Sequence, residues 1–201
     1  MTEAHRHFHD DLSQVKIRLL TMSGEAEAAL GLAVEALLER DGRKAQAVVS
    51  GDRVIDRMEV ELEEMCINLL ALQQPMARDL RMLTSALKIA NDLERVGDHA
   101  VNIAQSAQRL ADQRAIAPEP EIVEMARLAR DMLSDALEAF IRGDAQAGRE
   151  VCRRDDKVDV LLGSKYYAAN PAPGAPPLYA VLFDMVGDSG LQVYQEGNSL
   201  T

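Results

Sequence analysis

Apolar residues recur every three or four positions along most of the chain, a spacing that predicts long amphipathic helices. The first run contains Phe8, Leu12, Val15, Leu19, Met22, Ala26, Ala29 and Ala33. The second extends from Val48 to Leu72 and stops before Pro75, since proline suits only the first turn of a new helix. The third extends from Met82 to Leu110. Three helices of roughly 30 residues with short connections must lie antiparallel in one bundle.

Two further helices are predicted after a proline-containing loop at 116–120. One runs from about Glu121 to Arg142, and the other begins near Ala145. They repeat the first two when each residue is compared with the one 103 positions later. The matching pairs include Met22 and Met125, Ala33 and Ala136, Asp41 and Asp144, Val48 and Val151, Asp52 and Asp155, and Asp56 and Asp159. Because the turn position and an aspartate pair are both retained, we interpret this repeat as a duplication.

The repeat ends near residue 160. Glu59 and Glu63 predict acidic counterparts that the chain replaces with Leu162 and Tyr166. All four tyrosines lie beyond Gly163, in a segment that also contains several prolines. We therefore predict an all-α chain in three parts: a three-helix bundle over 1–115, a partial second bundle of two helices over 116–162, and a divergent tail over 163–201. A frameshift or truncation near residue 160 would explain a tail that packs poorly and apolar helix faces that lack a third partner.

The composition restricts the function. The 201 residues carry a net charge of −11, and only 3% of them are aromatic. This charge disfavours binding to nucleic acid or directly to an acidic membrane surface. The chain contains no signal-peptide pattern and no apolar run of about 18 residues, so we expect a cytoplasmic protein. Cys66 and Cys152 are too few and too far apart for a disulfide framework, and buried inert thiols are expected.

Two stripes of oxygen-bearing side chains border the predicted core. Asp52, Asp56, Glu59 and Glu63 follow the second helix, and Asn91, Glu94, Asp98, Asn102 and Gln105 follow the third. Carboxylates at this spacing repel each other unless a cation, solvent or a basic side chain compensates. Mg²⁺, Mn²⁺ and iron favour oxygen ligands, so the stripes are candidate metal ligands. A solvated acidic face balanced by Arg53, Arg57 and Arg95 is the alternative.

The sequence lacks the motifs that are typical of enzymes. There is no Glu-x-x-His pair for a di-iron enzyme, no glycine-rich phosphate loop, and no serine or cysteine nucleophile with a plausible histidine partner. We therefore expect a protein that is not an enzyme. His99 adjoins the acidic stripe, which leaves a histidine phosphotransfer bundle as one alternative. A purely structural bundle is another.

Two stretches of the third helical region resemble the PhoU family, the accessory proteins of bacterial phosphate transport. They are the runs 74–81 (QPMARDLR) and 86–104 (ALKIANDLERVGDHAVNIA). The resemblance covers about residues 8–160. It implies two similar three-helix bundles, each with acidic E/D-x-x-x-D motifs that bind metal ions or clusters of iron, zinc, manganese or magnesium. These motifs correspond here to Asp52 and Asp56, Glu94 and Asp98, and Asp155 and Asp159, with the second copy of the Glu94 motif missing.

The same resemblance implies a biological role. Proteins of this family repress the phosphate-starvation response when phosphate is plentiful. They are thought to contact the PstB ATPase of the transporter and the sensor kinase PhoR. The resemblance also implies a homodimer that reaches the inner membrane only peripherally, through those partners.

Overall fold

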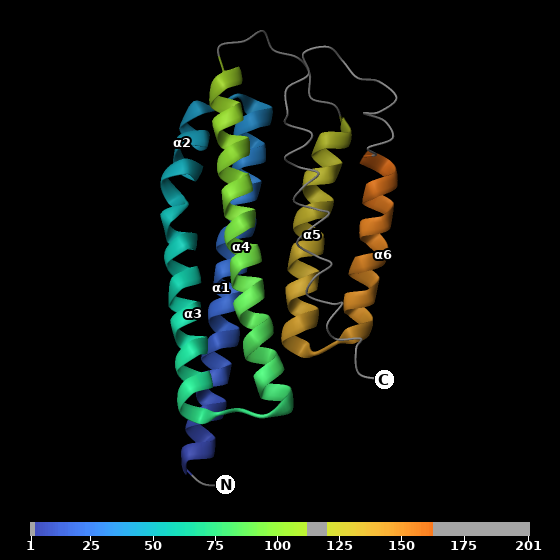
Figure 1. Ribbon diagram of the computed structural model, residues 1–201. Coiled ribbons are helices and arrows are strands. Elements are labelled where there is room, and N and C mark those ends of the chain that lie inside the picture. Colours follow the sequence, from blue (N-terminus) through green and yellow to red (C-terminus); the bar gives the residue numbers. More distant parts are fainter. Residues whose placement is uncertain (1–2, 112–119, 163–201) are drawn as a thin grey trace.

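The computed structural model describes residues 3–111 and 120–162, and their side chains over 7–111 and 123–155. Every regular element in these ranges is a helix, as predicted (Figure 1). The helices are α1 (Glu3–Glu39), α2 (Gly42–Gly51), α3 (Arg53–Gln73), α4 (Ala77–Leu110), α5 (Pro120–Arg142) and α6 (Ala145–Leu162). The predicted tail over 163–201 lies outside the described residues.

The main bundle consists of α1, the α2–α3 pair and α4, packed side by side (Figure 1). The sequence predicts one continuous middle helix, whereas the structure divides it at Asp52. The division is slight, because Asp52 has helical dihedral angles and its amide still donates to the carbonyl of Val48. Gly51, the last residue of α2, has a low helix propensity, which favours the irregularity at this point.

The core of the main bundle follows the predicted stripes. Leu19, Met22 and Leu30 of α1 are fully buried with Leu62 of α3 and Leu93 of α4. Leu72 is an exception: the stripe predicts a core residue, but its side chain is 79% exposed. It lies in the last turn of α3, next to the connection to α4 at one end of the bundle, where no described helix covers it.

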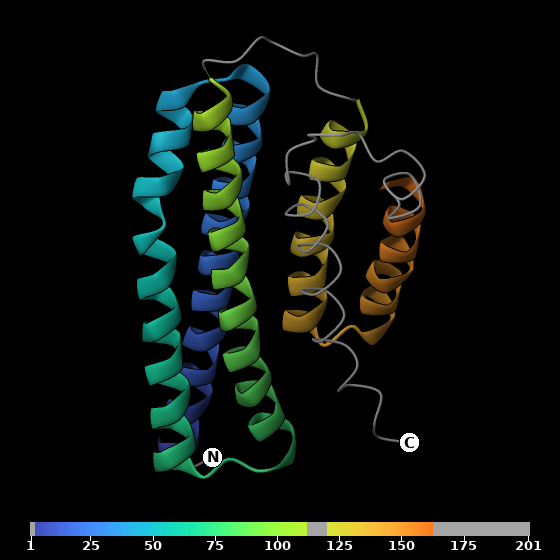
Figure 2. The ribbon, with the colours of Figure 1, turned by 45° about the horizontal axis from the view of Figure 1, so that its top comes forward.

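Helix α5 packs against α1, and α6 packs against α5 on the side away from the main bundle (Figure 2). Met125, Ala126 and Leu137 of α5 belong to the same core cluster as the main bundle. The expected open apolar face of this helix is thus partly covered by α1. Met132 and Ala136 form a second, smaller cluster with Val151 of α6.

The two turns that precede α2 and α6 have the same geometry. Arg40 and Gly143 both have positive φ, at 55° and 67°. The amide of Asp41 donates to Ala36 at 3.0 Å, and the amide of Asp144 donates to Ala139 at 2.8 Å. Each aspartate also accepts hydrogen bonds from the amides of the second and third residues of the next helix. This shared turn supports the interpretation of an internal duplication.

None of the described helices is long and apolar enough to cross a membrane.

Candidate functional site

Helices α3 and α4 bring together acidic side chains from both predicted stripes. We call the set Asp52, Asp56, Glu59, Glu94 and Asp98 the acidic seam. The short connection at residues 74–76 makes the two helices antiparallel, so residues near the start of α3 lie beside the middle of α4. The sequence prediction that the two stripes meet is therefore consistent with the fold.

The pKa shifts show how closely the charges interact. Burial raises the pKa of Glu94, and Asp98, Glu59, Asp56 and Asp52 raise it further. Burial also raises the pKa of Asp52, with smaller contributions from Asp56 and Asp98. Three of the carboxylates that act on Glu94 come from the opposite helix, so the seam is one electrostatic unit rather than two separate rows.

The pKa of Glu59 is raised in the same way. Burial raises its pKa, and Glu63 and Asp56 on the same helix add to the shift. The neighbours that shift Asp52, Glu59 and Glu94 are all carboxylates. Asp56 and Asp98 are exposed, as the alternative of a solvated acidic face expects. Arg53 and Arg57 are exposed, and Arg95 is half-buried.

Gly97 allows the two helices to approach closely within the seam. It is buried on α4, between Val96 and Asp98. A β-carbon added to it would lie 3.0 Å from Cδ1 of Ile55 and 3.4 Å from Oδ1 of Asp52. Glycine therefore places the carboxylate of Asp52 directly against the backbone of α4. The sequence analysis missed this residue, although a glycine inside a long helix is a signal of close packing.

The donor chemistry of the seam fits a cation that prefers oxygen ligands, because the partly buried carboxylates of Asp52 and Glu94 lie among other carboxylates that raise their pKa. The coordination geometry is a separate matter. In the part of the chain that the structure describes, no three His, Cys, Asp or Glu side chains converge in an arrangement that could hold a metal ion. The structure thus places candidate oxygen donors near one another, but not in an assembled coordination shell.

The remaining predicted residues lie at the margin of the seam. Glu63, Asn91, Asn102 and Gln105 are exposed on the helices that form it. His99 is half-buried on α4, next to Asp98. These positions extend the polar surface along both helices, but only Glu63 is coupled to a shifted carboxylate.

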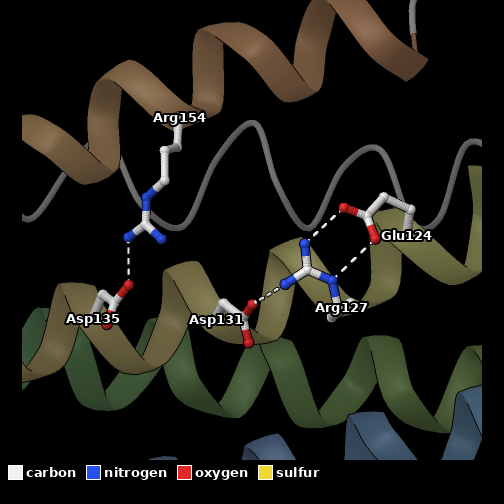
Figure 3. A network of polar contacts seen from close by, with 5 residues as sticks. All are labelled: Glu124, Arg127, Asp131, Asp135 and Arg154. Atoms are coloured by element: carbon white, nitrogen blue, oxygen red, sulfur yellow. Dashed lines mark hydrogen bonds and ion pairs between the residues drawn. The ribbon is translucent and has the colours of Figure 1, made fainter.

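The second acidic motif has a different environment. Asp155 on α6 is buried, and its helix packs against α5. The next residue back, Arg154, donates to Asp135 of α5 at 2.5 Å (Figure 3). On the same face of α5, Arg127 binds Glu124 and Asp131. The ion pair between Arg154 and Asp135 therefore joins α6 to α5, whereas those of Arg127 lie within α5. The side chain of Asp159 lies beyond those described.

The fold and the acidic seam define the chain as an all-helical bundle protein, and comparison with known proteins identifies the family. The family model of the PhoU domain matches residues 19–107 and 122–165. This chain belongs to the PhoU domain family, as the sequence resemblance predicts.

Individual relatives agree with this assignment. The phosphate-specific transport system accessory protein PhoU homolog of Clostridium acetobutylicum is 39% identical over 155 residues, which cover 77% of this chain and 71% of the relative. The PhoU protein of Escherichia coli K12 is 34% identical, with 76% and 63% covered. The crystal structure of PhoU from Pseudomonas aeruginosa matches with a TM-score of 0.79 and 30% identity, over 94% of this chain and 95% of that one. These relatives are named as accessory proteins rather than enzymes.

Proposed function

We propose that this chain is a negative regulator of the phosphate-starvation response and an accessory protein of phosphate-specific transport. The observation that carries the proposal is membership of the PhoU domain family, with relatives named phosphate-specific transport system accessory proteins. In this role the chain acts as an adaptor, not as an enzyme. It links a PstB-type transporter ATPase to a PhoR-type sensor kinase, as a cytoplasmic homodimer that reaches the inner membrane through these partners.

The acidic seam binds divalent metal in this proposal. Support comes from the carboxylates themselves: Asp52, Asp56 and Glu59 raise the pKa of Glu94 from the opposite helix, and Asp98 raises the pKa of Asp52, so negative charge is concentrated in the seam. A bound cation would remove this repulsion and hold α3 against α4. Asp52 and Asp56 would supply ligands from one helix, and Glu94 and Asp98 from the other. Binding would require the side chains to converge further than they do in the structure.

The test of the regulatory role uses a bacterial strain that lacks its own PhoU protein. The full chain is expressed in this strain together with a reporter under a phosphate-starvation promoter. We expect reporter expression at high phosphate to fall at least about tenfold. A tenfold change corresponds to a coupling free energy of about 1.4 kcal/mol in the equilibrium that controls signalling. Unchanged expression, with the protein present and folded, would reject the regulatory role.

The metal site is tested separately on purified full-length protein. Glu94→Gln and Asp98→Asn remove charge from the seam with little change in shape. Glu64→Gln is the matched control, since Glu64 is an exposed carboxylate on α3. After equilibration with Mn²⁺ and removal of free ion, the two seam variants should retain less metal than the wild type and the control. Equal metal content in all four proteins would reject the site but leave the regulatory role intact.

A further inference from the structure

The connection between α3 and α4 displays an apolar surface at one end of the main bundle. Leu72 is 79% exposed, Met76 is 81% exposed and Leu80 is 41% exposed. All three lie within nine residues of sequence around one turn, at the end of the bundle where α1 begins (Figures 1 and 2). We call this set, together with Arg78 and Arg81, the turn patch.

The backbone of the turn holds these side chains outward. Gln74 and Ala77 both have positive φ, at 46° and 45°, although neither is glycine. Such a conformation is uncommon for a residue other than glycine and persists only when the surroundings fix it. Two such residues bracket Pro75 and Met76, so the turn keeps Met76 exposed at a cost in conformational energy.

Positive charge accompanies the apolar residues. Arg78 and Arg81 are exposed in the first turns of α4, where the helix dipole is also positive. Within the part of the chain that the structure describes, neither guanidinium group takes part in an ion pair or a hydrogen bond. Asp79 is half-buried between them. The segment from Ala77 to Leu83 contains two arginines and one aspartate, a net charge of +1, in a protein of net charge −11.

Arg78 also reaches the neighbouring unit. A β-carbon added to Gly143, in the turn between α5 and α6, would lie 4.0 Å from Nη2 of Arg78. The turn patch therefore extends toward the α5–α6 connection. A partner seated on the patch would contact both the main bundle and the second unit.

We propose that the turn patch docks an acidic, apolar segment of another protein, with leucine-like side chains on the Leu72–Met76–Leu80 surface and carboxylates on Arg78 and Arg81. Methionine and arginine are enriched in protein interfaces, and methionine adapts its shape to a partner. A lipid surface is disfavoured because the patch lacks the tryptophan and tyrosine typical of membrane interfaces and because the protein carries a net charge of −11. The turn patch is a different surface from the acidic seam, and docking on it does not depend on a bound metal.

The probe is a pair of helical peptides of about 16 residues with the same leucine positions, one carrying glutamate and the other lysine at the flanking sites. We expect the full-length protein to bind the glutamate peptide about tenfold more tightly than the lysine peptide in fluorescence anisotropy, a difference of about 1.4 kcal/mol. The double variant Arg78→Glu/Arg81→Glu should reverse this preference. The double variant Leu72→Ser/Met76→Ser should weaken both peptides.

Controls and contrary outcomes are defined in advance. Arg43→Glu, an exposed arginine at the other end of the bundle, should leave the preference unchanged. Circular dichroism confirms that each variant folds. Equal binding of the two peptides, or no binding of either, would overturn the proposal. Binding to phosphatidylglycerol vesicles without a peptide preference would assign the patch to a membrane instead. Self-association lost in the Leu72→Ser/Met76→Ser variant would assign it to a second copy.

Discussion

Asp52, which lies between α2 and α3, is in direct proximity to Gly97 of α4: a β-carbon on Gly97 would lie 3.4 Å from Oδ1 of Asp52. This close approach links the packing of the bundle to its charge, because Gly97, which has no side chain, is followed directly by Asp98. A carboxylate held against a helix backbone loses part of its hydration, and burial is the largest cause of the raised pKa of Asp52.

Substitution of Gly97 tests this relationship. Alanine in an open helix position stabilises a protein by up to about 1 kcal/mol relative to glycine. At Gly97 the new β-carbon would press on Ile55 at 3.0 Å, and overpacking typically costs about 1–3 kcal/mol. Gly24→Ala is the matched control, because nothing lies within 4 Å of a β-carbon there. Urea unfolding should show Gly97→Ala to be less stable than Gly24→Ala by about 1 kcal/mol or more. Equal stabilisation by both would contradict the close approach.

The pH dependence of stability follows from the sign of the seam shifts. The pKa of Glu94 is raised above its ordinary value of 4.5, so the folded state binds more protons than the unfolded state in the window just above that value. Stability is therefore lost as pH rises through the folded pKa. In metal-free buffer, Glu94→Gln should be more stable than the wild type at pH 7, by a few tenths to about 1 kcal/mol. The difference should shrink as pH falls toward the ordinary value.

The control for the pH experiment is a carboxylate shifted in the opposite direction. The pKa of Glu124 on α5 is lowered, and the largest cause is the hydrogen bond that Arg127 donates to its carboxylate. Its contribution to stability is present above the ordinary value of 4.5 and lost as pH falls through the lowered pKa. Glu124→Gln should therefore be no more stable than the wild type at pH 7. A seam variant that behaved in the same way would show that the seam charges do not repel.

Removing the aspartate cap from either of the two duplicated turns should destabilise the helix that follows it. Asp41 accepts hydrogen bonds from the amides of Arg43 and Lys44, at 2.8 and 3.3 Å. Asp41→Ala should cost about 1 kcal/mol in global unfolding, because α2 packs within the main bundle. Asp144→Ala removes the equivalent cap of α6, which packs mainly on α5.

Hydrogen exchange distinguishes the two caps. Loss of the Asp144 cap should raise the exchange rate of α6 amides and leave those of α1 and α4 near their wild-type rates. Asp10→Ala, at an exposed position on α1, serves as the control. A uniform increase throughout the chain after Asp144→Ala would show that α6 unfolds only together with the main bundle.

Thiol reactivity should separate the two cysteines. Cys66 is buried, and this burial raises the pKa of its thiol to about 11. Its thiolate is therefore scarce at neutral pH, and reagent access is blocked. Cys152 is only partly covered. A colorimetric disulfide reagent should modify Cys152 first in the native protein and Cys66 only after denaturant is added. Rapid modification of Cys66 in a Cys152→Ser variant would contradict the buried position.

Much of the fold was accessible from the chain alone. The stripe through Leu19, Met22 and Ala33 predicts the buried face of α1 because helix periodicity fixes which side chains share a face. The matching Asp41 and Asp144 predict a repeated turn, and both cap a helix in the structure. Leu72 shows the limit of this reasoning. Periodicity assigns a residue to a face, but whether another helix covers that face depends on where the neighbours end.

The acidic seam likewise has features that the sequence predicts and features that it does not. Its composition is determined by local spacing, since Glu94 and Asp98 lie one turn apart on any helix, as do Asp52 and Asp56. The sequence therefore determined the helices, their apolar faces, the family and the carboxylates. Only the tertiary structure decided that Gly97 lets Asp52 reach α4, that α5 shares the core of the main bundle, and that Met76 is exposed. These features depend on contacts between residues far apart in the chain, and local periodicity contains no information about such distances.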